Sequence, residues 1–416
     1  MIKYIGSKRR LVPVLGAMAG AVEARTALDL FTGTTRVAQE LKRRGAHVTA
    51  VDTARYSHVL ARCYVETDGR AIDTDALDDA VTSLDALPPA PGYFTETFCV
   101  RSRFFQPHNG ARVDAIRDAI ERDHRDTPLY PILLTSLIEA ADRVDSTTGV
   151  QMAYVKRWAP RSFKPLTLRV PRLVAGAGAA RHADACTLVR SLAPVDFAYL
   201  DPPYNQHRYF TNYHIWETLV AWDAPAHYGV ACKRIDAREP HTRSVFNSRA
   251  EMPDALAALV REVDARVVVL SYNDESWITL DDLRDMCAVR GTVDVLAVDS
   301  KRYVGAQIGV HDLRGVRVGT VSHLRNVEYL VVSGERADVE RVAGAGRDAL
   351  AGGRGGAVPG GGCDGPGVGG PGRLDTRGHG TSAARGAAGD RASSATAGRT
   401  GPRAPGRAEA VTDGAQ

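Results

Sequence analysis

The C-terminal part of the sequence lacks aromatic residues. Tyr329 is the last aromatic residue of the 416, and residues 341–416 hold 22 of the 40 glycines. A segment of this composition cannot bury enough apolar surface to offset the entropy lost on ordering. We therefore expect a disordered Gly/Ala/Arg-rich tail over residues 336–416 and a folded part over residues 1–335.

The six cysteines lack the close spacing of metal ligands or of a disulfide framework. No Cys-x-x-Cys pair and no Cys/His ligand pattern occurs, which favours a reducing compartment. The sequence also lacks a run of about 18 apolar residues and the apolar core of a signal peptide. These absences predict a cytoplasmic protein with no bound metal and no membrane partner.

A large excess of positive charge is missing as well. The formal net charge is +4, and residues 341–416 account for it because they contain ten arginines against six acidic residues. The folded part is therefore close to neutral, and bulk charge does not indicate a nucleic-acid partner. Any such contact has to come from local basic clusters, such as residues 8–10 or 156–164.

Short apolar runs alternate with stretches of helical periodicity. The runs are Thr26–Phe31, His47–Val51, Val195–Leu200, Arg266–Leu270, Val293–Val298 and Asn326–Val332, and the helical patterns include Arg36–Arg44, Pro253–Asp264 and Leu280–Ala288. This alternation predicts an α/β fold with a parallel sheet covered on both faces. Because ligands bind at the carboxyl ends of such strands, we expect the chemistry just after these runs.

Residues 57–180 break this alternation. They contain a proline-rich break at 87–92, an aromatic and basic segment at 101–105, and helical patterns at 113–122 and 132–142. We interpret this stretch as an inserted, mainly helical subdomain. The predicted organisation is therefore 1–56 and 181–335 as two parts of one α/β domain, 57–180 as the insertion, and 336–416 as the tail.

The first candidate motif joins an apolar strand to a helix through a glycine turn. It runs from Asp29 to Gly33, and Thr34 or Thr35 is the expected N-cap of the helix. Gly33 would let the backbone pass close to a ligand, although an ordinary strand–turn–helix fits the motif equally well. Asp52 ends the next apolar run, about twenty residues later, where a carboxylate can accept hydrogen bonds from a ribose. The two motifs together favour a nucleotide-like cofactor.

The most specific signal is Asp201-Pro-Pro-Tyr204, which follows an apolar strand. Each proline removes a backbone donor and holds the residue before it extended. The carboxylate of Asp201 and a main-chain carbonyl of this turn can then face one small donor group, with Tyr204 beside them for stacking. An exocyclic amino group of a base fits, because two acceptors would localise its lone pair and stabilise the cation that forms during alkylation.

These residues together resemble the Dam-like class of DNA adenine methyltransferases. The resemblance rests on residues 201–204, on Asp29–Gly33 and on the N-terminal Lys3-Tyr-Ile-Gly-Ser-Lys8 segment, with weaker matches at 104–109, 137–142, 212–214, 271–275 and 326–330. It covers about residues 1–333. It implies a Rossmann-like, S-adenosylmethionine-dependent methyltransferase fold whose insertion recognises the DNA target.

The resemblance also implies roles for single residues. The cofactor residues of the class fall on Tyr4, Lys8, Asp52, Asp184 and Asp201, with Asp29 and Gly33 in the turn that faces the methionine part of the donor. The catalytic roles fall on Asp201 and Pro202 as acceptors for the adenine amino group and on Tyr204 as the stacking residue. One departure is Thr35, where the class usually has a second glycine.

The expected activity is methyl transfer from S-adenosylmethionine to adenine in double-stranded DNA, after the base leaves the duplex. Candidate phosphate contacts in the insertion are Arg101, Arg103, Arg157, Arg161 and Lys164. A companion restriction or phage-defence system is an expected partner. Two alternatives stay open, which are the same chemistry on cytosine in DNA or adenine in RNA, and a DNA-binding relative without turnover.

Overall fold

The computed structural model describes residues 2–6, 8–152, 154, 157–204, 206, 208–301, 310–311, 317–319 and 325–352. At its centre is a seven-stranded sheet with the order β3-β2-β1-β4-β7-β11-β8. The strands are β1 (Thr26–Leu30), β2 (His47–Asp52), β3 (Ala179–His182), β4 (Val195–Leu200), β7 (Ala265–Asn273), β8 (Thr292–Lys301) and β11 (Arg325–Gly334). Two short pairs lie outside this sheet, formed by β5 (His227–Tyr228) with β6 (Lys233–Arg234) and by β9 (Val310–His311) with β10 (Arg317–Gly319).

The sheet is mixed, and this corrects the expected parallel sheet. Strands β3, β2, β1, β4 and β7 pair in parallel, whereas β11 runs antiparallel to both β7 and β8. An apolar run does not encode strand direction. Strands β8 and β11 can pair antiparallel without the crossover connection that a parallel pair needs.

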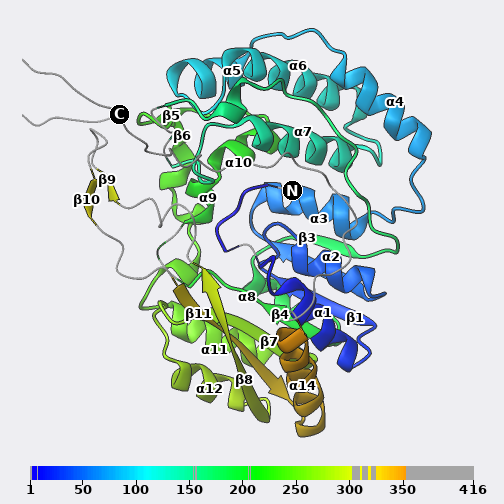
Figure 1. Cartoon of the computed structure of the whole chain (residues 1–416), viewed down its shortest axis with the longest axis vertical. Helices are drawn as coiled ribbons and strands as arrows, with labels where there is room; N and C mark the ends of the chain where they lie inside the picture. Colours follow the sequence, from blue (N-terminus) through cyan, green and yellow to red (C-terminus); the bar gives the residue numbers. More distant parts are fainter. Residues whose placement is uncertain are drawn as a thin grey trace, which may run out of the picture. The chain divides into compact units, whose positions relative to one another are not determined.

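Helices cover both faces, as the sequence predicts (Figure 1). On one face, α1 (Val12–Ala21), α2 (Arg36–Arg43) and α14 (Arg336–Gly352) share a core with Val267 and Val269 of β7. On the other, α8 (Ala185–Leu188), α11 (Met252–Glu262) and α12 (Leu280–Ala288) pack with Val268 and Leu270. Alternate residues of one strand thus point to opposite faces, and an apolar run without polar alternation is buried on both sides.

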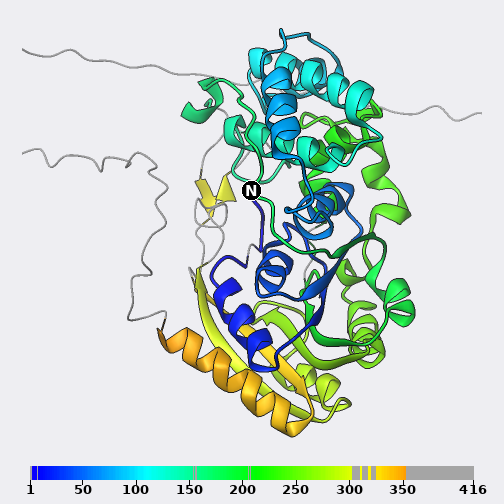
Figure 2. The same ribbon diagram turned by 90° about the vertical axis from the view of Figure 1, so that its right-hand side faces the viewer.

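Helix α14 corrects the predicted start of the tail, because residues 336–352 are an ordered helix beside α1 (Figure 2). Val339 and Val342 are at most 1% exposed. A Cβ on Gly346 would lie 2.7 Å from Leu296 Cδ2, so the glycine allows close packing. Arg266 Nε and Nη2 each donate to Asp338 at 2.7 Å and hold the start of the helix. Residues 353–416 lie outside the described part of the chain.

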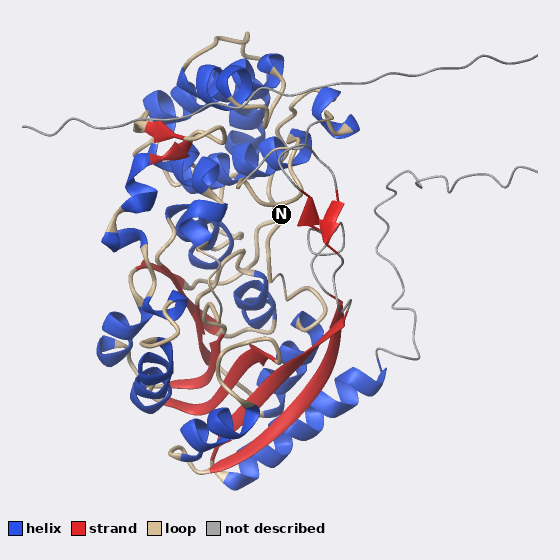
Figure 3. Cartoon of the chain, turned by 90° about the vertical axis from the view of Figure 1, so that its left-hand side faces the viewer, coloured by secondary structure: helices blue, strands red, loops and turns tan. Residues whose placement is uncertain are grey.

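The predicted insertion forms a mainly helical layer next to the sheet, seen as the group of helices at the top of Figure 3, above the large red sheet. Its elements are α3 (Arg55–Ala61), α4 (Thr74–Asp85), α5 (Tyr93–Thr95), α6 (Pro107–His124), α7 (Tyr130–Val144) and the π- and 3-10 turns η1 (Arg62–Glu66), η2 (Glu96–Arg101) and η3 (Pro160–Phe163). Helices α9 (Tyr209–Asn212) and α10 (His214–Ala221), which follow β4, belong to the same layer. Arg117 of α6 is 1% exposed and donates from Nε to the Leu219 carbonyl of α10 at 2.8 Å.

Within the described residues, no helix has both the length and the apolar surface to cross a membrane. The described cysteines, Cys63, Cys99, Cys186, Cys232 and Cys287, are free thiols, and Cys363 lies outside that part. No group of three or more His, Cys, Asp or Glu side chains there could hold a metal ion.

Candidate cofactor and catalytic site

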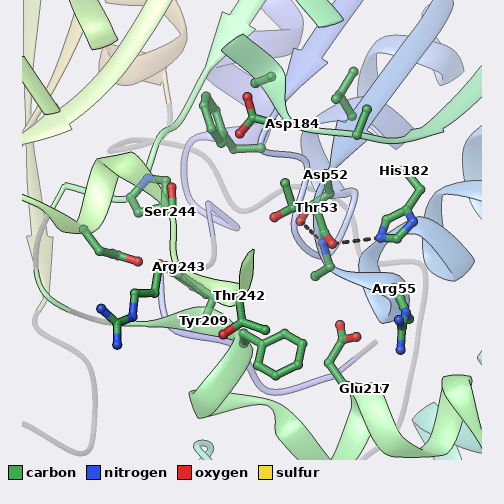
Figure 4. Close-up of a pocket in the computed structure, with 18 of the residues that line it drawn as sticks. Asp52, Thr53, Arg55, His182, Asp184, Tyr209, Glu217, Thr242, Arg243 and Ser244 are labelled. Atoms are coloured by element: carbon green, nitrogen blue, oxygen red, sulfur yellow. Dashed lines mark hydrogen bonds between the residues drawn. The ribbon is translucent and has the colours of Figure 1, made fainter. Parts of the chain in front are cut away.

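A cavity of about 360 Å³ opens at the carboxyl ends of the parallel strands. Small-molecule sites commonly have volumes of about 300–1,000 Å³. Its walls come from residues 4–6, from the segments that follow β1, β2, β3 and β4, from α9 and α10, and from residues 236–247. Figure 4 shows side chains from these separate segments facing one space. The cavity is where the strand pattern predicts a ligand.

Asp52 lines this cavity at the end of β2. Its Oδ2 accepts from the Gly33 amide at 2.8 Å and its Oδ1 from the Ala54 amide at 2.9 Å. Burial raises the pKa of Asp52, and the two amide donors oppose that rise. The carboxylate is therefore held by neutral main-chain donors, and each oxygen has further acceptor capacity for a ligand.

Gly33 lies in the first turn, directly against the ring of Tyr4. Its φ is +51°, and a Cβ there would lie 3.0 Å from the Tyr4 ring. Tyr4 lines the cavity and stacks on Tyr213 at 4.7 Å between ring centroids. The glycine lets the N-terminal segment close over the first turn, because any side chain would meet Tyr4 and strain the left-handed backbone.

Asp29 is 1% exposed and holds the same turn from beneath. Its Oδ2 accepts from Thr32 Oγ1 at 2.8 Å and from the Ala38 amide at 3.1 Å. Burial raises the pKa of Asp29 to about 7, while these hydrogen bonds act in the opposite direction. Neither Asp29 nor Gly33 is among the residues that line the cavity, so their role toward the donor stays a prediction.

The predicted helix cap is confirmed in position at Thr35, but not in its expected side-chain hydrogen bond. Thr35 occupies the cap position with φ +60°, but its side chain does not cap the helix. It accepts instead from Gln39 Nε2 at 2.9 Å, and Asp29 supplies the acceptor for an amide of the first turn. A glycine would adopt this left-handed conformation without steric cost.

Asp201 lines the cavity at the end of β4 and is joined to Lys8. The Lys8 Nζ lies 3.0 Å from Asp201 Oδ1 and also contacts Glu328 Oε1. Burial raises the pKa of Asp201 to about 6; Lys8 opposes the rise and Glu328 adds to it. Burial by itself would lower the pKa of Lys8, but the two carboxylates outweigh it and the pKa lies well above its usual value.

The other residues predicted around Asp201 have separate positions. Pro203 lines the cavity, whereas Lys8, Pro202 and Tyr204 are not among its lining residues. Lys8 is 7% exposed and reaches the site through Asp201. The Tyr204 ring packs edge-on against Tyr272 at 5.5 Å, and Lys8 Nζ lies 5.8 Å from its centroid.

Asp184 is exposed at the rim of the cavity. Its Oδ1 caps α8 by accepting from the Thr187 amide at 3.1 Å. The neighbouring His182 Nε2 lies 2.8 Å from the Thr53 carbonyl (Figure 4). The Asp184 side chain therefore has a structural role as the cap of α8, and its role toward the cofactor stays a prediction.

Sequence reasoning missed Glu217 of α10. Glu217 is 1% exposed, and its Oε1 has no hydrogen-bond partner within the described structure. Burial raises its pKa to about 7. Figure 4 shows its carboxylate pointing toward the β2 segment with Asp52 and Thr53. The signal was present as an acid inside an apolar helical run, His-Ile-Trp-Glu-Thr-Leu-Val-Ala, because a glutamate is rarely fully buried.

Acidic groups dominate the cavity lining. They are Asp52, Asp184, Asp201, Glu217 and Asp236, against the two arginines Arg55 and Arg243. A cavity with this charge suits a ligand that carries positive charge and hydroxyl donors. S-adenosylmethionine has a sulfonium, an ammonium and a ribose diol, so the residues present fit it.

The basic residues predicted to contact phosphates differ in their partners and in their exposure. Arg161 donates to Asp145 Oδ1 at 2.7 Å and to the Thr147 carbonyl, and Arg101 pairs with Glu96 at 2.9 Å. The Arg103 guanidinium lies 4.8 Å from the Trp158 ring centroid. Arg157 and Lys164 are exposed, and Lys156 lies outside the described residues. Arg161 is therefore committed to an internal ion pair, and the DNA contacts stay predictions.

The sheet order, the helices on both faces and the cavity at the carboxyl ends fit the Rossmann-like fold of a methyltransferase. Residues 4–286 match the model of the D12 class N6 adenine-specific DNA methyltransferases, and the chain belongs to this family. It is an enzyme that methylates adenine in DNA with S-adenosylmethionine as methyl donor. The predicted class, activity and cofactor are confirmed.

Curated relatives support this assignment. The chain is 29% identical over 317 residues to the type II methyltransferase M.NlaIII of Neisseria lactamica, a match that covers 73% of this chain and 92% of that protein. It is 27% identical over 321 residues to the type II methyltransferase M.CviAII of Paramecium bursaria Chlorella virus 1, with 73% and 92% covered. It is 28% identical over 325 residues to the modification methylase StsI of Streptococcus sanguinis, covering 73% of this chain and 49% of that protein.

Proposed function

We propose that the cavity binds S-adenosylmethionine with its adenosine end at Asp52 and Asp184 and its methyl group toward Asp201. The bound donor supplies a methyl group on an electron-poor sulfonium. Asp52 would accept hydrogen bonds from the ribose hydroxyls, and Tyr4 would cover the donor from the N-terminal segment. The acidic lining supports this orientation, because carboxylates flank the path of a cation.

In the proposed mechanism, Asp201 and the Pro202 carbonyl accept the two hydrogens of the adenine amino group. These acceptors localise the nitrogen lone pair and stabilise the positive charge that develops as the nitrogen–carbon bond forms and the carbon–sulfur bond of the donor breaks. S-adenosylhomocysteine would then leave, and the methylated nitrogen would lose one hydrogen as a proton to solvent. One preorganised hydrogen-bond partner of this kind changes a rate by roughly 10²–10³. Tyr204 would stack on the base. The observation that carries the proposal is that Asp201 and Asp52 line one cavity from the ends of two separate strands.

The target adenine must leave the duplex to reach this cavity, at a cost of a few kcal/mol. We propose that the helical layer formed by the insertion grips double-stranded DNA and reads a specific sequence. Arg157 and Lys164 support this, because both are exposed basic side chains of that region. If phosphate contacts dominate, DNA affinity falls steeply with salt concentration.

The relatives indicate the biological setting. Two of them are named type II methyltransferases and a third a modification methylase. We therefore propose that this enzyme acts in the cytoplasm, where it protects DNA at a site cut by a companion restriction endonuclease. Sequencing of methylated adenines in DNA from cells that express the chain would identify that site.

The test of the catalytic assignment is Asp201→Ala. We expect no detectable transfer of tritiated methyl groups to plasmid DNA and an unchanged circular dichroism spectrum. Asp281→Ala is the matched control, because Asp281 is 90% exposed on α12 and its loss leaves activity at the wild-type level. Methylation by Asp201→Ala would refute the assigned role.

A further inference from the structure

A buried chain of polar groups connects Asp201 to the antiparallel edge of the sheet. Ser271 Oγ of β7 donates to Glu328 Oε1 of β11 at 2.8 Å. The same Glu328 oxygen contacts Lys8 Nζ, which lies 3.0 Å from Asp201 Oδ1. The side chains of Lys8, Glu328 and Asp201 are 7%, 14% and 18% exposed. This series of side-chain contacts thus leads from Ser271 through Glu328 and Lys8 to the proposed catalytic carboxylate of Asp201.

The buried ammonium of Lys8 in this series of polar groups needs acceptors that are held in place. A buried lysine is costly unless paired, and the four-carbon stem of Lys8 leaves its ammonium free to rotate. Glu328 supplies a second, fixed acceptor on a rigid strand, and Ser271 fixes that acceptor in turn. The ammonium is held between two carboxylates and can therefore direct Asp201 Oδ1. The Lys8 carbonyl also accepts from the Leu11 amide at 2.7 Å, which ties the residue to the start of α1.

We propose that Glu328, supported by Ser271, is a positioning residue that acts through Lys8 to orient the Asp201 carboxylate for the adenine amino group. Glu328 acts at a distance, since it does not line the cavity. The inference rests on the proposed catalytic role of Asp201. It assigns Lys8 to the support of that carboxylate instead of direct contact with the donor.

The charges around Asp201 make the proposal testable by pH. The groups that face it are Lys8, Glu328 and Asp29 as charged or titratable side chains and the phenols of Tyr199, Tyr204 and Tyr209. Lys8 lowers the pKa of Asp201, and Glu328 raises it. Removing one or the other charge must therefore move the ionisation of Asp201 in opposite directions, which loss of packing would not do.

The experiment measures the single-turnover rate of methyl transfer against pH with saturating S-adenosylmethionine and unmethylated plasmid DNA. In Lys8→Met we expect the acid limb to move up by about 1–3 pH units, the usual effect of an opposite charge within ion-pair distance. In Glu328→Gln we expect it to move down and the plateau rate to fall about tenfold or more, since Lys8 loses its second anchor. Ser271→Ala alters no charge, so we expect a lower plateau and an unmoved acid limb.

Lys3→Met is the matched control. Lys3 also belongs to the N-terminal segment and is ion-paired, to Asp142 at 2.9 Å and Asp145 at 3.3 Å, away from Asp201. We expect its acid limb to coincide with that of the wild type. Coincident acid limbs in Lys8→Met and Glu328→Gln would overturn the proposal, as would a wild-type plateau in Ser271→Ala. If Glu328→Gln does not fold, the proposal is tested by the acid limb of Lys8→Met and by the plateau rate of Ser271→Ala.

Failure of this inference is distinguishable from failure of the proposed function. An inactive Asp201→Ala together with unmoved acid limbs in the charge variants would leave the catalytic role standing and remove only the positioning role. An active Asp201→Ala would remove both.

Discussion

The two ends of the cavity hold their carboxylates by different means. Asp52 at the β2 end is fixed by two main-chain amides, and Asp201 at the β4 end is fixed by a buried side-chain ammonium. Main-chain donors are set by the local turn and carry no net charge. A lysine is a charge on a flexible stem that needs its own support. The Asp52 carboxylate is therefore fixed mainly by its own turn, whereas the ion pair of Asp201 joins segments that are far apart in the sequence.

The largest expected effect separates binding from chemistry. Asp52→Ala should weaken S-adenosylmethionine binding by about 1.5–3 kcal/mol, the value of a hydrogen bond to a charged group, while the single-turnover rate recovers at saturating donor. Asp201→Ala should lose at least about 10²-fold in that rate at any donor concentration. Isothermal titration calorimetry and rapid quench would measure the two quantities. If the single-turnover rate of Asp52→Ala stays low at saturating S-adenosylmethionine, Asp52 is not confined to donor binding and the two ends of the cavity do not differ in this way.

The next effect is the pH dependence of the wild type. The proposed role of Asp201 needs the ionised form, because protonation turns one oxygen into a donor and weakens the other as an acceptor. Its pKa is about 6, so the single-turnover rate should fall about tenfold per unit below pH 6. Because this pKa is raised above its unfolded value, protonation of Asp201 stabilises the fold. The loss of rate should therefore occur with an unchanged circular dichroism spectrum. A rate that stays constant down to pH 5 would contradict the assignment.

A smaller effect is expected from Glu217→Gln, which should change both the stability of the fold and the binding of the donor. Its pKa of about 7 exceeds the usual value of a glutamate, so its contribution to stability is favourable below about pH 4.5 and is lost as the pH rises to 7. At pH 8, Glu217→Gln should raise the free energy of unfolding by about 2–3 kcal/mol and weaken donor binding. Urea denaturation and calorimetry would test both, with Asp281→Asn as control. Tighter donor binding by the variant would exclude a role for this carboxylate at the cavity.

The smallest effects concern the glycine turn. Gly33→Ala should lower the free energy of unfolding by about 1–2 kcal/mol, since it places a Cβ at positive φ against the Tyr4 ring. Thr35→Gly removes left-handed strain but also the Gln39 hydrogen bond and increases the entropy of the unfolded chain, so the net change should stay below about 1 kcal/mol. Chemical denaturation would measure both. A large loss in Thr35→Gly would show that the threonine is a required part of the turn.

The predictability of the site follows the range of its contacts. The strand, glycine turn and acid at 29–52 form a local unit, so their spacing predicts that Gly33 and Asp52 lie together. The Asp-Pro-Pro-Tyr turn is equally local, because its prolines restrict their neighbours directly. The sequence did not predict Glu217 as a site residue, because its burial depends on packing between α10 and segments that are distant in the chain. Glu328 lies 320 residues from Lys8, and no local pattern connects them.

The amino-acid sequence by itself determined six of the seven strands of the sheet and the position of the chemistry at their ends, because backbone conformation and apolar periodicity act over a few residues. The class of enzyme followed from the resemblance of its short motifs to a known family. Only the tertiary structure decided the antiparallel direction of β11, the ordered helix α14 and the contacts of Lys8 with Asp201 and Glu328. These features arise when segments far apart in the chain are buried together, and the cost of burying charge without a partner then selects which groups meet.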